Sequence, residues 1–331
     1  MFGMTACSDK LPSEKGPYRT YSEAGGFEIC YWNGGRWISP SQHADWITHW
    51  SLEKGQENLK HRGTPNSLSI VLTGRNDNYD GNFDVRLITA LSRNIELLPD
   101  AEFIYVCWNP KLDTPPLAVK LKRLFPRLKC YVVHPKFHAQ YCIIDEFLEY
   151  PAKNVGIRRA KGEYILSTNS DVILSPQVAE SMHMCQLRWD EVYRATRVDI
   201  PFHNLNVTFP LKPQDILEEQ KGLYNASGDF LLLHRETWKR LTGYCEEFPG
   251  QRLHKDSFAV HILTEVFKYP CQDLGQITHW RHPSSWSSSH KRPAVGDVHW
   301  DFKTSGFKSN RDTWGLTFAR EEDRNGVTWL V

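Results

Sequence analysis

Short apolar runs alternate with segments of helical periodicity through the first part of the chain. Residues 68–73 and 102–108 are nearly continuous apolar runs, a pattern typical of buried strands. Apolar side chains recur at helical spacing over 83–95 and again over 116–125. A further apolar run follows at 128–133. The pattern therefore predicts strands and helices in alternation.

The same alternation continues in the middle of the chain. Residues 154–160 are expected to be helical and residues 163–167 to form a strand. The second part is more mixed, with helices predicted over 177–189, 236–241 and 256–267. Strands that alternate with helices form a largely parallel sheet that is covered on both faces. We therefore expect an α/β fold with a Rossmann-like, mostly parallel sheet flanked by helices.

The two ends of the chain depart from this pattern. Residues 1–62 are rich in Gly, Trp and polar turn formers and show no sustained period. Near the other end the sequence becomes polar and Ser-rich. We therefore expect one domain over 63–290, with residues 1–62 as an N-terminal extension packed on this core and residues 291–331 as a C-terminal tail. No fixed-period repeat is present, which excludes solenoids and propellers.

Charge and hydrophobicity narrow the possible partners. The 331 residues include 40 Lys and Arg against 39 Asp and Glu, which gives a net charge of +1. A chain so balanced has no general electrostatic attraction for nucleic acid, so no nucleic-acid partner is expected. Its longest apolar run is far shorter than the roughly 20 residues of a membrane-spanning helix. Without a transmembrane segment or a signal peptide, the expected location is cytoplasmic.

Motifs of several common enzyme classes are missing. No GxGxxG follows the first strand-like run and no GxxxxGK[ST] occurs, which disfavours hydride transfer from a dinucleotide and P-loop phosphoryl transfer. The GxSxG and HExxH motifs are absent as well. The eight cysteines form no CxxC pair, so we expect reduced and mostly buried thiols.

Polar side chains gather where two of the predicted strands end. Arg75–Asp77 follows the first strand, and Asn169–Asp171 follows the strand predicted over 163–167. Because ligands of open α/β sheets bind outside the carboxyl ends of the strands, both loops are expected to face one crevice. An Asn-x-Asp pair presents two oxygen ligands on one side of a turn, which suits Mg²⁺ or Mn²⁺ shared with a diphosphate.

At this point the sequence resembles a known family. Residues 154–171 read NVGIRRAKGEYILSTNSD, which is similar to the segment of family 2 type GT-A glycosyltransferases that runs through N-x-G-x-x-x-A-x-G-E-Y into the metal-binding Asp-x-Asp. Residues 69–78 resemble the first strand and loop of that family. Residues 228–235 and 243–246, followed by Asp256, resemble its acceptor-side half.

The resemblance covers residues 66–282 and implies a GT-A-like catalytic domain. It would have a nucleotide-sugar half over 63–175 and an acceptor half over 176–290. In that family a carboxylate after the first strand holds the uridine, and a carboxylate of the acceptor half is the catalytic base. The chain departs from the family at two positions: Asn169 stands where the first Asp is most common, and Lys255 rather than an acid precedes the base position.

Residue roles follow from the resemblance together with residue chemistry. A divalent cation, Mn²⁺ or Mg²⁺, is the expected cofactor. Its expected ligands are Asp171, Asn169, His279 and His282. The expected donor-binding residues are Arg75, Asp77, Asn154, Arg158 and Asn169. The expected catalytic carboxylates are Asp256, as the base, and Glu246.

Each of these roles has a simpler alternative that the sequence leaves open. Asp77 is able to form an Asx-turn within its own loop, and Asp171 is able to cap a following helix. The arginines at 158–159 fit a solvated helix face, and the two histidines fit ordinary surface residues. Between the adjacent glutamates at 246–247 the sequence does not choose.

The predicted activity is metal-dependent transfer of a sugar from a nucleotide diphosphate sugar, expected to be a UDP-sugar, to a hydroxyl of a carbohydrate acceptor. The resemblance implies inversion at the anomeric carbon. Aromatic residues with flat faces for stacking the acceptor are Trp238, Tyr244, Trp280 and Trp286. One alternative is a non-catalytic carbohydrate-binding or scaffold protein that retains the fold. Nucleotidyl transfer to a sugar phosphate is disfavoured because its glycine-rich phosphate loop is missing.

Overall fold

The structure is a computed structural model of the chain. It describes residues 64–78, 81–141, 147–202, 205–246, 255–282 and 310–331, together with five strands nearer the N-terminus. The chain divides into two compact units. One comprises Met1–Pro65 and Met184–Arg188, and the other comprises Asn66–His183 and Trp189–Val331.

The first unit contains an antiparallel sheet of its own. Its strands are β1 (Met4–Ala6), β2 (Gly16–Tyr21), β3 (Phe27–Trp32), β4 (Trp37–Ile38) and β5 (His49–Ser51). They pair in the order β1-β5-β2-β3-β4. The region over 1–62, in which the sequence pattern indicates no regular element, therefore contains five strands.

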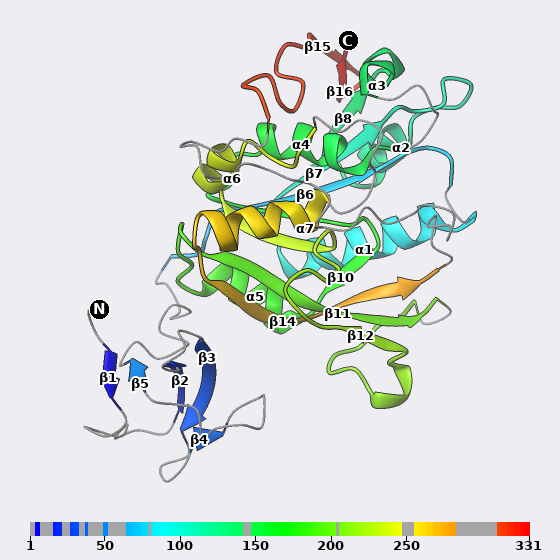
Figure 1. Cartoon of the computed structure of the whole chain (residues 1–331). Coiled ribbons are helices and arrows are strands. Elements are labelled where there is room, and N and C mark those ends of the chain that lie inside the picture. The colour runs from blue at the N-terminus through cyan, green and yellow to red at the C-terminus, as the bar shows by residue number, and fades with distance from the viewer. Residues whose placement is uncertain are drawn as a thin grey trace, which may run out of the picture. The chain divides into compact units, whose positions relative to one another are not determined.

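The second unit is built on one sheet of eleven strands (Figure 1). Its strands are β6 (Leu68–Gly74), β7 (Glu102–Trp108), β8 (Lys129–Val133), β9 (Tyr164–Thr168), β10 (Val172–Leu174), β11 (Val192–Pro201), β12 (Glu218–Gln220), β13 (Phe230–His234), β14 (Cys271–Arg281), β15 (Glu321–Arg324) and β16 (Val327–Leu330). They follow the order β10-β14-β11-β13-β9-β6-β7-β8-β16-β15, and β12 pairs with β11.

The sheet has a parallel block and a mixed part. Strands β9, β6, β7, β8 and β16 run parallel to their neighbours within the block. Beyond β9, strand β13 is antiparallel to both β9 and β11, and β14 is parallel to β11 but antiparallel to β10. The predicted α/β architecture is confirmed, with antiparallel strands concentrated in the half expected to face the acceptor.

Helices lie on both faces of the parallel block. The described helices of this chain are α1 (Phe83–Leu97), α2 (Leu117–Leu124), α3 (Pro135–Tyr141), α4 (Glu149–Arg159), α5 (Pro176–Met184), α6 (Arg235–Leu241) and α7 (Lys255–His261), of which α2 and α4 contact the parallel strands directly. A π-helical turn, Ile262–Val266, continues α7, and Pro213–Asp215 form a short 3₁₀ turn. Figure 1 shows α1 and α4 on opposite sides of β6 and β7. Strand β6 is buried along its whole length as a result.

Most of the predicted elements are present, but none of the strands from β10 to β14 is predicted. The four predicted strands correspond to β6, β7, β8 and β9. Helix α4 begins before residue 154, and the helix predicted over 177–189 ends at Met184. Strands β11 and β14 escape prediction because their polar and charged residues interrupt the apolar pattern.

The C-terminal residues belong to the large sheet. Strand β16 pairs in parallel with β8, and Val327 and Leu330 are fully buried. Trp314 and Leu316 join the same hydrophobic cluster as Val155 of α4. The region over 291–331, expected to be a tail, thus ends in two strands of the main sheet.

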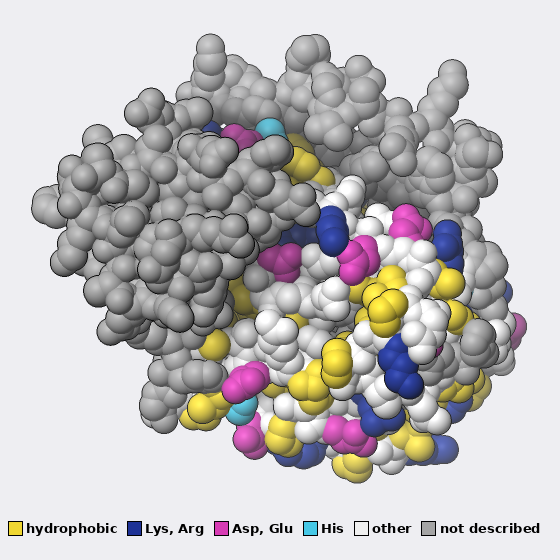
Figure 2. Space-filling model, turned by 90° about the horizontal axis from the view of Figure 1, so that it is seen from below, with side chains coloured by type: hydrophobic (Ala, Val, Ile, Leu, Met, Phe, Trp, Pro, Cys, Tyr) yellow, Lys and Arg dark blue, Asp and Glu magenta, His cyan; other side chains and the backbone are white. Residues whose placement is uncertain are grey.

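The structure also bears on three expectations from the sequence: membrane-spanning helices, the state of the cysteines and the distribution of charge on the surface. Within the described part of the chain, no helix is long and apolar enough to cross a bilayer. The described cysteines are free thiols and most of them are buried. Burial raises the pKa of Cys107 and Cys130 to about 12. On the face seen in Figure 2, basic and acidic side chains are interspersed among the described residues.

Candidate active site

The register of the sheet brings distant polar residues together. Strand β14 lies between β10 and β11, and His279 is the register partner of Val172 on β10 and of Asp199 on β11. Asp171 immediately precedes Val172, and His282 follows the end of β14. Three separate segments of the chain therefore contribute side chains to one point at the edge of the sheet.

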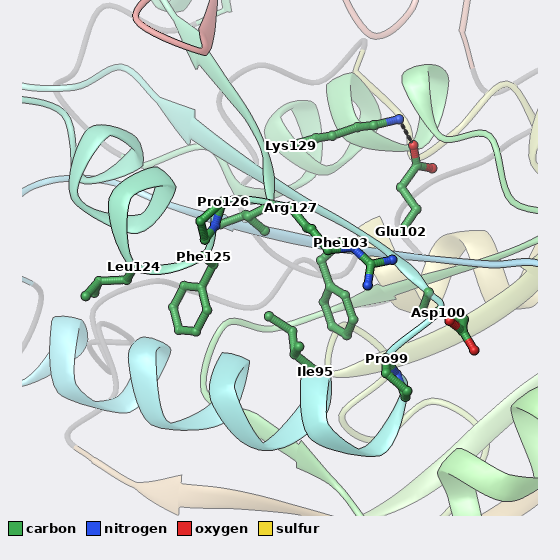
Figure 3. A pocket seen from close by; sticks show the side chains of 12 residues that line it. Ile95, Pro99, Asp100, Glu102, Phe103, Leu124, Phe125, Pro126, Arg127 and Lys129 are labelled. Atoms are coloured by element: carbon green, nitrogen blue, oxygen red, sulfur yellow. Dashed lines mark hydrogen bonds and ion pairs between the residues drawn. The ribbon is translucent and has the colours of Figure 1, made fainter.

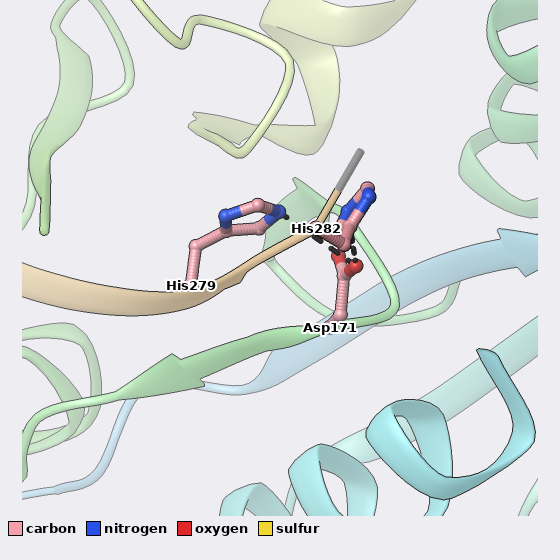
Figure 4. Close-up of side chains that lie close together, drawn as sticks. All are labelled: Asp171, His279 and His282. Carbon is pink, nitrogen blue, oxygen red and sulfur yellow. Dashed lines mark ion pairs between the residues drawn. The ribbon is translucent and has the colours of Figure 1, made fainter. Parts of the chain in front are cut away.

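Asp171, His279 and His282 form a candidate metal site, with their side chains converging as Figure 4 shows. The Oδ2 atom of Asp171 lies 3.1 Å from Nε2 of His282 and 3.7 Å from Nε2 of His279. One ligand atom from each residue lies within 4.8 Å of the other two. Three such ligands suit a divalent transition metal and leave further coordination positions for a substrate. The two imidazoles favour Mn²⁺ over Mg²⁺, which prefers oxygen ligands.

Asp199 orients the imidazole of His279. Nδ1 of His279 lies 2.9 Å from Oδ1 of Asp199, and a carboxylate only accepts, so Nδ1 is assigned the proton. The other nitrogen, Nε2, then faces Asp171 as a candidate metal ligand. Burial lowers the pKa of His279, but Asp171 and Asp199 outweigh this effect and the pKa is raised. A carboxylate behind a ligating histidine is the usual device for fixing its tautomer.

Asp171 is held in its ionised form. Burial opposes its charge, yet His279, His282 and Arg86 keep the pKa of this carboxyl well below its usual range. Arg86 is fully buried on α1, with Nε 3.3 Å from Oδ2 of Asp171. Arg86 is not among the residues predicted from the sequence. Its position three residues after Phe83 places this charged residue on the apolar face of the predicted helix, which is the pattern that could have indicated it.

The two strand-end loops meet at one edge of the sheet, as predicted. Oγ of Ser170 donates a hydrogen bond of 2.6 Å to the carbonyl of Thr73, which ties the loop before β10 to the end of β6. In the loop after β6, Nη2 of Arg75 lies 2.6 Å from Oδ2 of Asp77. Both of these side chains are partly exposed. They lie at the carboxyl end of β6, where ligands of such sheets bind.

Asn169 makes a different set of contacts from Asp171. Its Oδ1 accepts a hydrogen bond of 2.7 Å from Nζ of Lys153, and its Nδ2 donates one of 2.5 Å to Oδ1 of Asp229. The amide oxygen therefore faces an ammonium group. Both ends of the Asn169 amide are thus hydrogen-bonded to Lys153 and Asp229, whereas Asp171 faces His279 and His282.

Asp256 lies close to a second carboxylate. It is the second residue of α7 and accepts a hydrogen bond of 2.7 Å from Oγ of Ser227. A Cβ added to Gly228 would lie 3.3 Å from Oδ2 of Asp256 and 3.6 Å from Oε1 of Glu149, so both carboxylates approach this glycine. Partial burial raises the pKa of Glu149, Lys153 opposes the rise, and Asp256 adds to it. Glu149 was missed, although its spacing of four residues from Lys153 on a helix suggests an ion pair.

Glu246 and Asn154 are hydrogen-bonded to each other and to neighbouring protein groups. Oε1 of Glu246 accepts hydrogen bonds from Nδ2 of Asn154 at 2.8 Å and from the N–H of Gly315 at 3.0 Å. Its Oε2 accepts from the hydroxyl of Tyr141. Oδ1 of Asn154 accepts from the N–H of Tyr244 at 2.8 Å. These contacts argue against a catalytic role for Glu246 and a donor-binding role for Asn154.

Arg158 and three of the aromatic candidates are engaged elsewhere in the fold. The guanidinium of Arg158 sits over the ring of Trp314, 4.9 Å from its centroid, at the C-terminal end of α4. Lys153, nearer the start of that helix, is the α4 residue that reaches Asn169. Three of the aromatic residues expected to stack on a sugar are fully buried or nearly so: Trp238, Tyr244 and Trp280. The fourth, Trp286, lies outside the described residues.

A hollow of about 400 Å³ lies at the opposite edge of the parallel block (Figure 3). It surrounds the first residues of β7 and β8, and its lining includes Phe103, Arg127 and Lys129. Glu102 on its rim accepts hydrogen bonds from Lys129 and from the N–H of Lys161. Because these are the amino ends of the strands, the hollow is separate from the candidate active site.

Comparisons with known proteins concern the fold. No protein-family model matches this sequence, and no curated protein matches it either. The chain is similar to a solved structure of the mannosyltransferase PcManGT from Pyrobaculum calidifontis in complex with GDP-Man and Mn²⁺, at 14% identity and a TM-score of 0.40, over 67% of this chain and 58% of that one.

Two further solved structures are similar at the same level. GalNAc-T7 with UDP, GalNAc and Mn²⁺ matches at 13% identity and a TM-score of 0.40, over 70% of this chain and 46% of that one. S. aureus TarS matches at 14% identity and a TM-score of 0.37, over 60% of this chain and 34% of that one. These neighbours are GT-A glycosyltransferases. The chain spans less than two thirds of each of them.

Proposed function

We propose that this protein is a metal-dependent glycosyltransferase that moves a sugar from a nucleotide diphosphate sugar to an acceptor hydroxyl. The observation that carries the proposal is the convergence of Asp171, His279 and His282 at the edge of the sheet. The loop that holds Asp171 is tied to the end of β6, and Arg75–Asp77 follow directly. Metal ligands and nucleotide-binding groups are thereby available at one edge.

A metal ion held by these ligands would neutralise the negative charge that develops in this reaction. A leaving nucleoside diphosphate develops negative charge that must be neutralised in the transition state. Arg86 is a fixed cation near the site, but its guanidinium is directed at Asp171. Asp171, His279 and His282 would hold a Mn²⁺ ion, which when bound supplies Lewis-acid stabilisation of the departing diphosphate.

The donor nucleoside is assigned to the loop after β6. Asp77 presents a carboxylate that can accept a hydrogen bond from a base N–H or a ribose hydroxyl, as expected for a UDP-sugar. Arg75 holds that carboxylate in place through contacts of 2.6 and 2.7 Å. The same guanidinium follows the carboxyl end of β6, where it could also bind a phosphate of the donor.

Asp256 is assigned as the base. In the proposed step the acceptor hydroxyl gives its proton to Asp256, its oxygen forms a bond to the anomeric carbon, and the bond from that carbon to the diphosphate oxygen breaks. A single displacement of this kind inverts the configuration. Glu246, the other sequence candidate, is withdrawn from this role because its oxygens already accept hydrogen bonds from protein groups.

Calorimetry with UDP and enzymatic turnover test the proposal. UDP should bind more tightly when Mn²⁺ is added, and Asp171→Asn should lose that increment. Asp113→Asn, on an exposed loop, is the matched control and should keep it. Equal binding of UDP in EDTA would refute the metal site. Release of nucleotide diphosphate from a panel of nucleotide sugars should then be seen, whereas binding without any turnover would favour the scaffold alternative.

A further inference from the structure

We infer that a line of polar and charged side chains positions the imidazole of His279, so that metal affinity depends on residues of the acceptor half. The inference rests on the proposed metal site and extends it. The charge line consists of Glu149, Lys153, Asn169, Asp229, Arg197 and Asp199. It runs from the neighbourhood of Asp256 to the candidate metal ligands.

Lys153 fixes the first part of the charge line. Its side chain is completely buried. Its Nζ donates to Oε1 of Glu149 at 2.5 Å, to Oδ1 of Asn169 at 2.7 Å and to the carbonyl of Gly228 at 2.7 Å. An ammonium group has three donors, and all three are used. These three hydrogen bonds therefore fix the position of the Lys153 ammonium group.

Lys153 also dictates which way the amide of Asn169 points. Because the ammonium needs an acceptor, it takes the amide oxygen and leaves the NH₂ group for Asp229. Oδ2 of Asp229 then accepts from Nη1 of Arg197 at 2.7 Å. An aspartate at position 169 would instead set a carboxylate against the carboxylate of Asp229, which is almost fully buried. This contact gives a physical reason for asparagine at a position where the resembling family most often has aspartate.

Arg197 links Asp229 to Asp199, the carboxylate that contacts His279. It lies two residues before Asp199 on β11, on the same side of the strand. Its Nη2 donates to Oδ2 of Asp199 at 3.1 Å, and Oδ1 of the same carboxylate holds Nδ1 of His279. Nε of Arg197 also lies 3.0 Å from Oδ1 of Asp199, so the guanidinium contacts both carboxylate oxygens and fixes the orientation of the carboxylate that faces the imidazole. Loss of a member leaves a buried charge unpaired, so its neighbours must move.

The substitution Asn169→Asp separates this role from direct metal binding. If Asn169 is an ordinary ligand position, the carboxylate will tighten Mn²⁺ binding. If the charge line positions His279, the repulsion at Asp229 will weaken Mn²⁺ binding by about tenfold or more, the range seen when partners behind metal ligands are changed. Mn²⁺ affinity is measured by calorimetry or by electron paramagnetic resonance, with no nucleotide or acceptor present.

The double variant Asn169→Asp with Asp229→Asn provides the decisive comparison. Exchanging the amide and the carboxylate removes the repulsion, so the double variant should bind Mn²⁺ more tightly than Asn169→Asp alone. Simple additivity of the two effects would overturn the inference. Arg159→Met is the control, because Arg159 is also largely buried but contacts Glu321 and Gly315, neither of which belongs to the charge line. It should lower the melting temperature without changing Mn²⁺ affinity.

The outcomes distinguish this inference from the proposed function. If the native protein binds no Mn²⁺, the metal site itself is wrong and the charge line loses its purpose. If the native protein binds Mn²⁺ and Asn169→Asp binds it equally or more tightly while folded, only the positioning role fails. Should Asn169→Asp not fold, Arg197→Lys tests the same link, because lysine lacks the fork that joins Asp229 to Asp199. Unchanged Mn²⁺ affinity in folded Arg197→Lys would equally overturn the inference.

Discussion

Asn169 and Asp171 are two positions apart but serve different groups. Asp171 faces two histidines and a buried arginine, whereas Asn169 faces Lys153 and Asp229. An Asn-x-Asp pair therefore need not act as a pair of ligands. The two carboxylates predicted from the sequence to be catalytic also differ in their surroundings. Asp256 accepts a hydrogen bond from Ser227, whereas Glu246 accepts hydrogen bonds from three protein groups.

We predict that Asp256→Asn lowers turnover by about 10²-fold or more with little change in donor affinity, because the amide keeps the shape but cannot take a proton. Glu246→Gln is the matched control. It should reduce stability, since Glu246 joins Asn154, Gly315 and Tyr141, and should leave turnover per folded molecule nearly unchanged. Steady-state kinetics and thermal melts measure the two effects. Near-native turnover in folded Asp256→Asn would move the base to Glu149.

At the level of elements, the sequence motif that suggested the family runs from helix α4 through the turn into β9. Within N-x-G-x-x-x-A-x-G-E-Y, Asn154 binds the backbone of Tyr244 and the N–H of Gly162 donates to Oγ of Ser69. Gly156 lets the helix approach Val71 of β6. The motif therefore specifies how α4 packs against β6 and how the chain enters β9. The candidate site residues are side chains that lie outside these packing contacts.

Gly156→Ala is predicted to destabilise the protein although alanine is the better helix former. The added Cβ would lie 2.5 Å from Cγ1 of Val71, which is stiff and fully buried, and overpacking of this kind costs about 1–3 kcal/mol. Denaturant unfolding measures the loss. The double variant Gly156→Ala with Val71→Ala should be less destabilised than the sum of its parts. Additive effects would contradict the close approach.

The connection that precedes β13 carries an exposed aromatic ring, which we propose as an acceptor contact in place of the buried candidates. The ring of Tyr224 is 41% exposed and lies 6.5 Å from that of His261 on α7. The backbone carbonyl oxygen of Tyr224 lies 3.0 Å from Oγ of Ser227, whose hydroxyl donates to Asp256. The ring is therefore attached next to the assigned base.

We predict that Tyr224→Ala raises the KM for a carbohydrate acceptor several-fold while leaving UDP affinity unchanged, because an exposed aromatic face gives a sugar ring its stacking surface. Trp189→Ala is the matched control, since Trp189 is exposed but packs beside Tyr269, and it should change neither value. Acceptor titrations at saturating donor measure KM. Equal KM values for the Tyr224→Ala variant and the native protein would remove the ring from the acceptor site.

Across the second unit, Glu102 joins the starts of neighbouring strands. It accepts hydrogen bonds from Ser69 on β6, from Lys129 on β8 and from the N–H of Lys161 before β9. Burial raises the pKa of Glu102, but these donors outweigh it and the pKa is lowered. A carboxyl with a lowered pKa stabilises the folded state above its unfolded pKa, and this contribution is lost as the pH falls through its folded pKa.

Glu102→Gln should therefore lower the free energy of unfolding by about 1 kcal/mol at pH 7, because the ionic hydrogen bonds are lost. The difference from the native protein should shrink progressively below about pH 4.3, the ordinary glutamate pKa, as the native carboxyl takes up its proton. Urea unfolding across this pH range measures it. Glu96→Gln, at a side chain that is 70% exposed, should show little effect at any pH. A difference independent of pH would contradict the charged role of Glu102.

The α/β class, the strands β6 to β9 and the meeting of two strand-end loops could be predicted because they depend on local patterns. Continuous apolar runs mark buried parallel strands, helical periodicity marks the helices that cover them, and the ends of parallel strands must share an edge. Asp171 was found for the same reason, since it directly follows such a strand. His279 and His282 were found only as residue types able to bind a metal.

The partners of these residues depended on register, which local sequence does not encode. His279 meets Asp199 because β14 pairs with β11 in one alignment, and a shift by one residue would turn the imidazole to the other face. Arg86 and Lys153 lie on helices and reach the site only through packing. Residues 310–331 join the sheet because β16 pairs with β8, nearly 200 positions away in the chain. A local pattern specifies an element and its buried face, whereas the contacts that give a side chain its chemistry arise when distant elements pair.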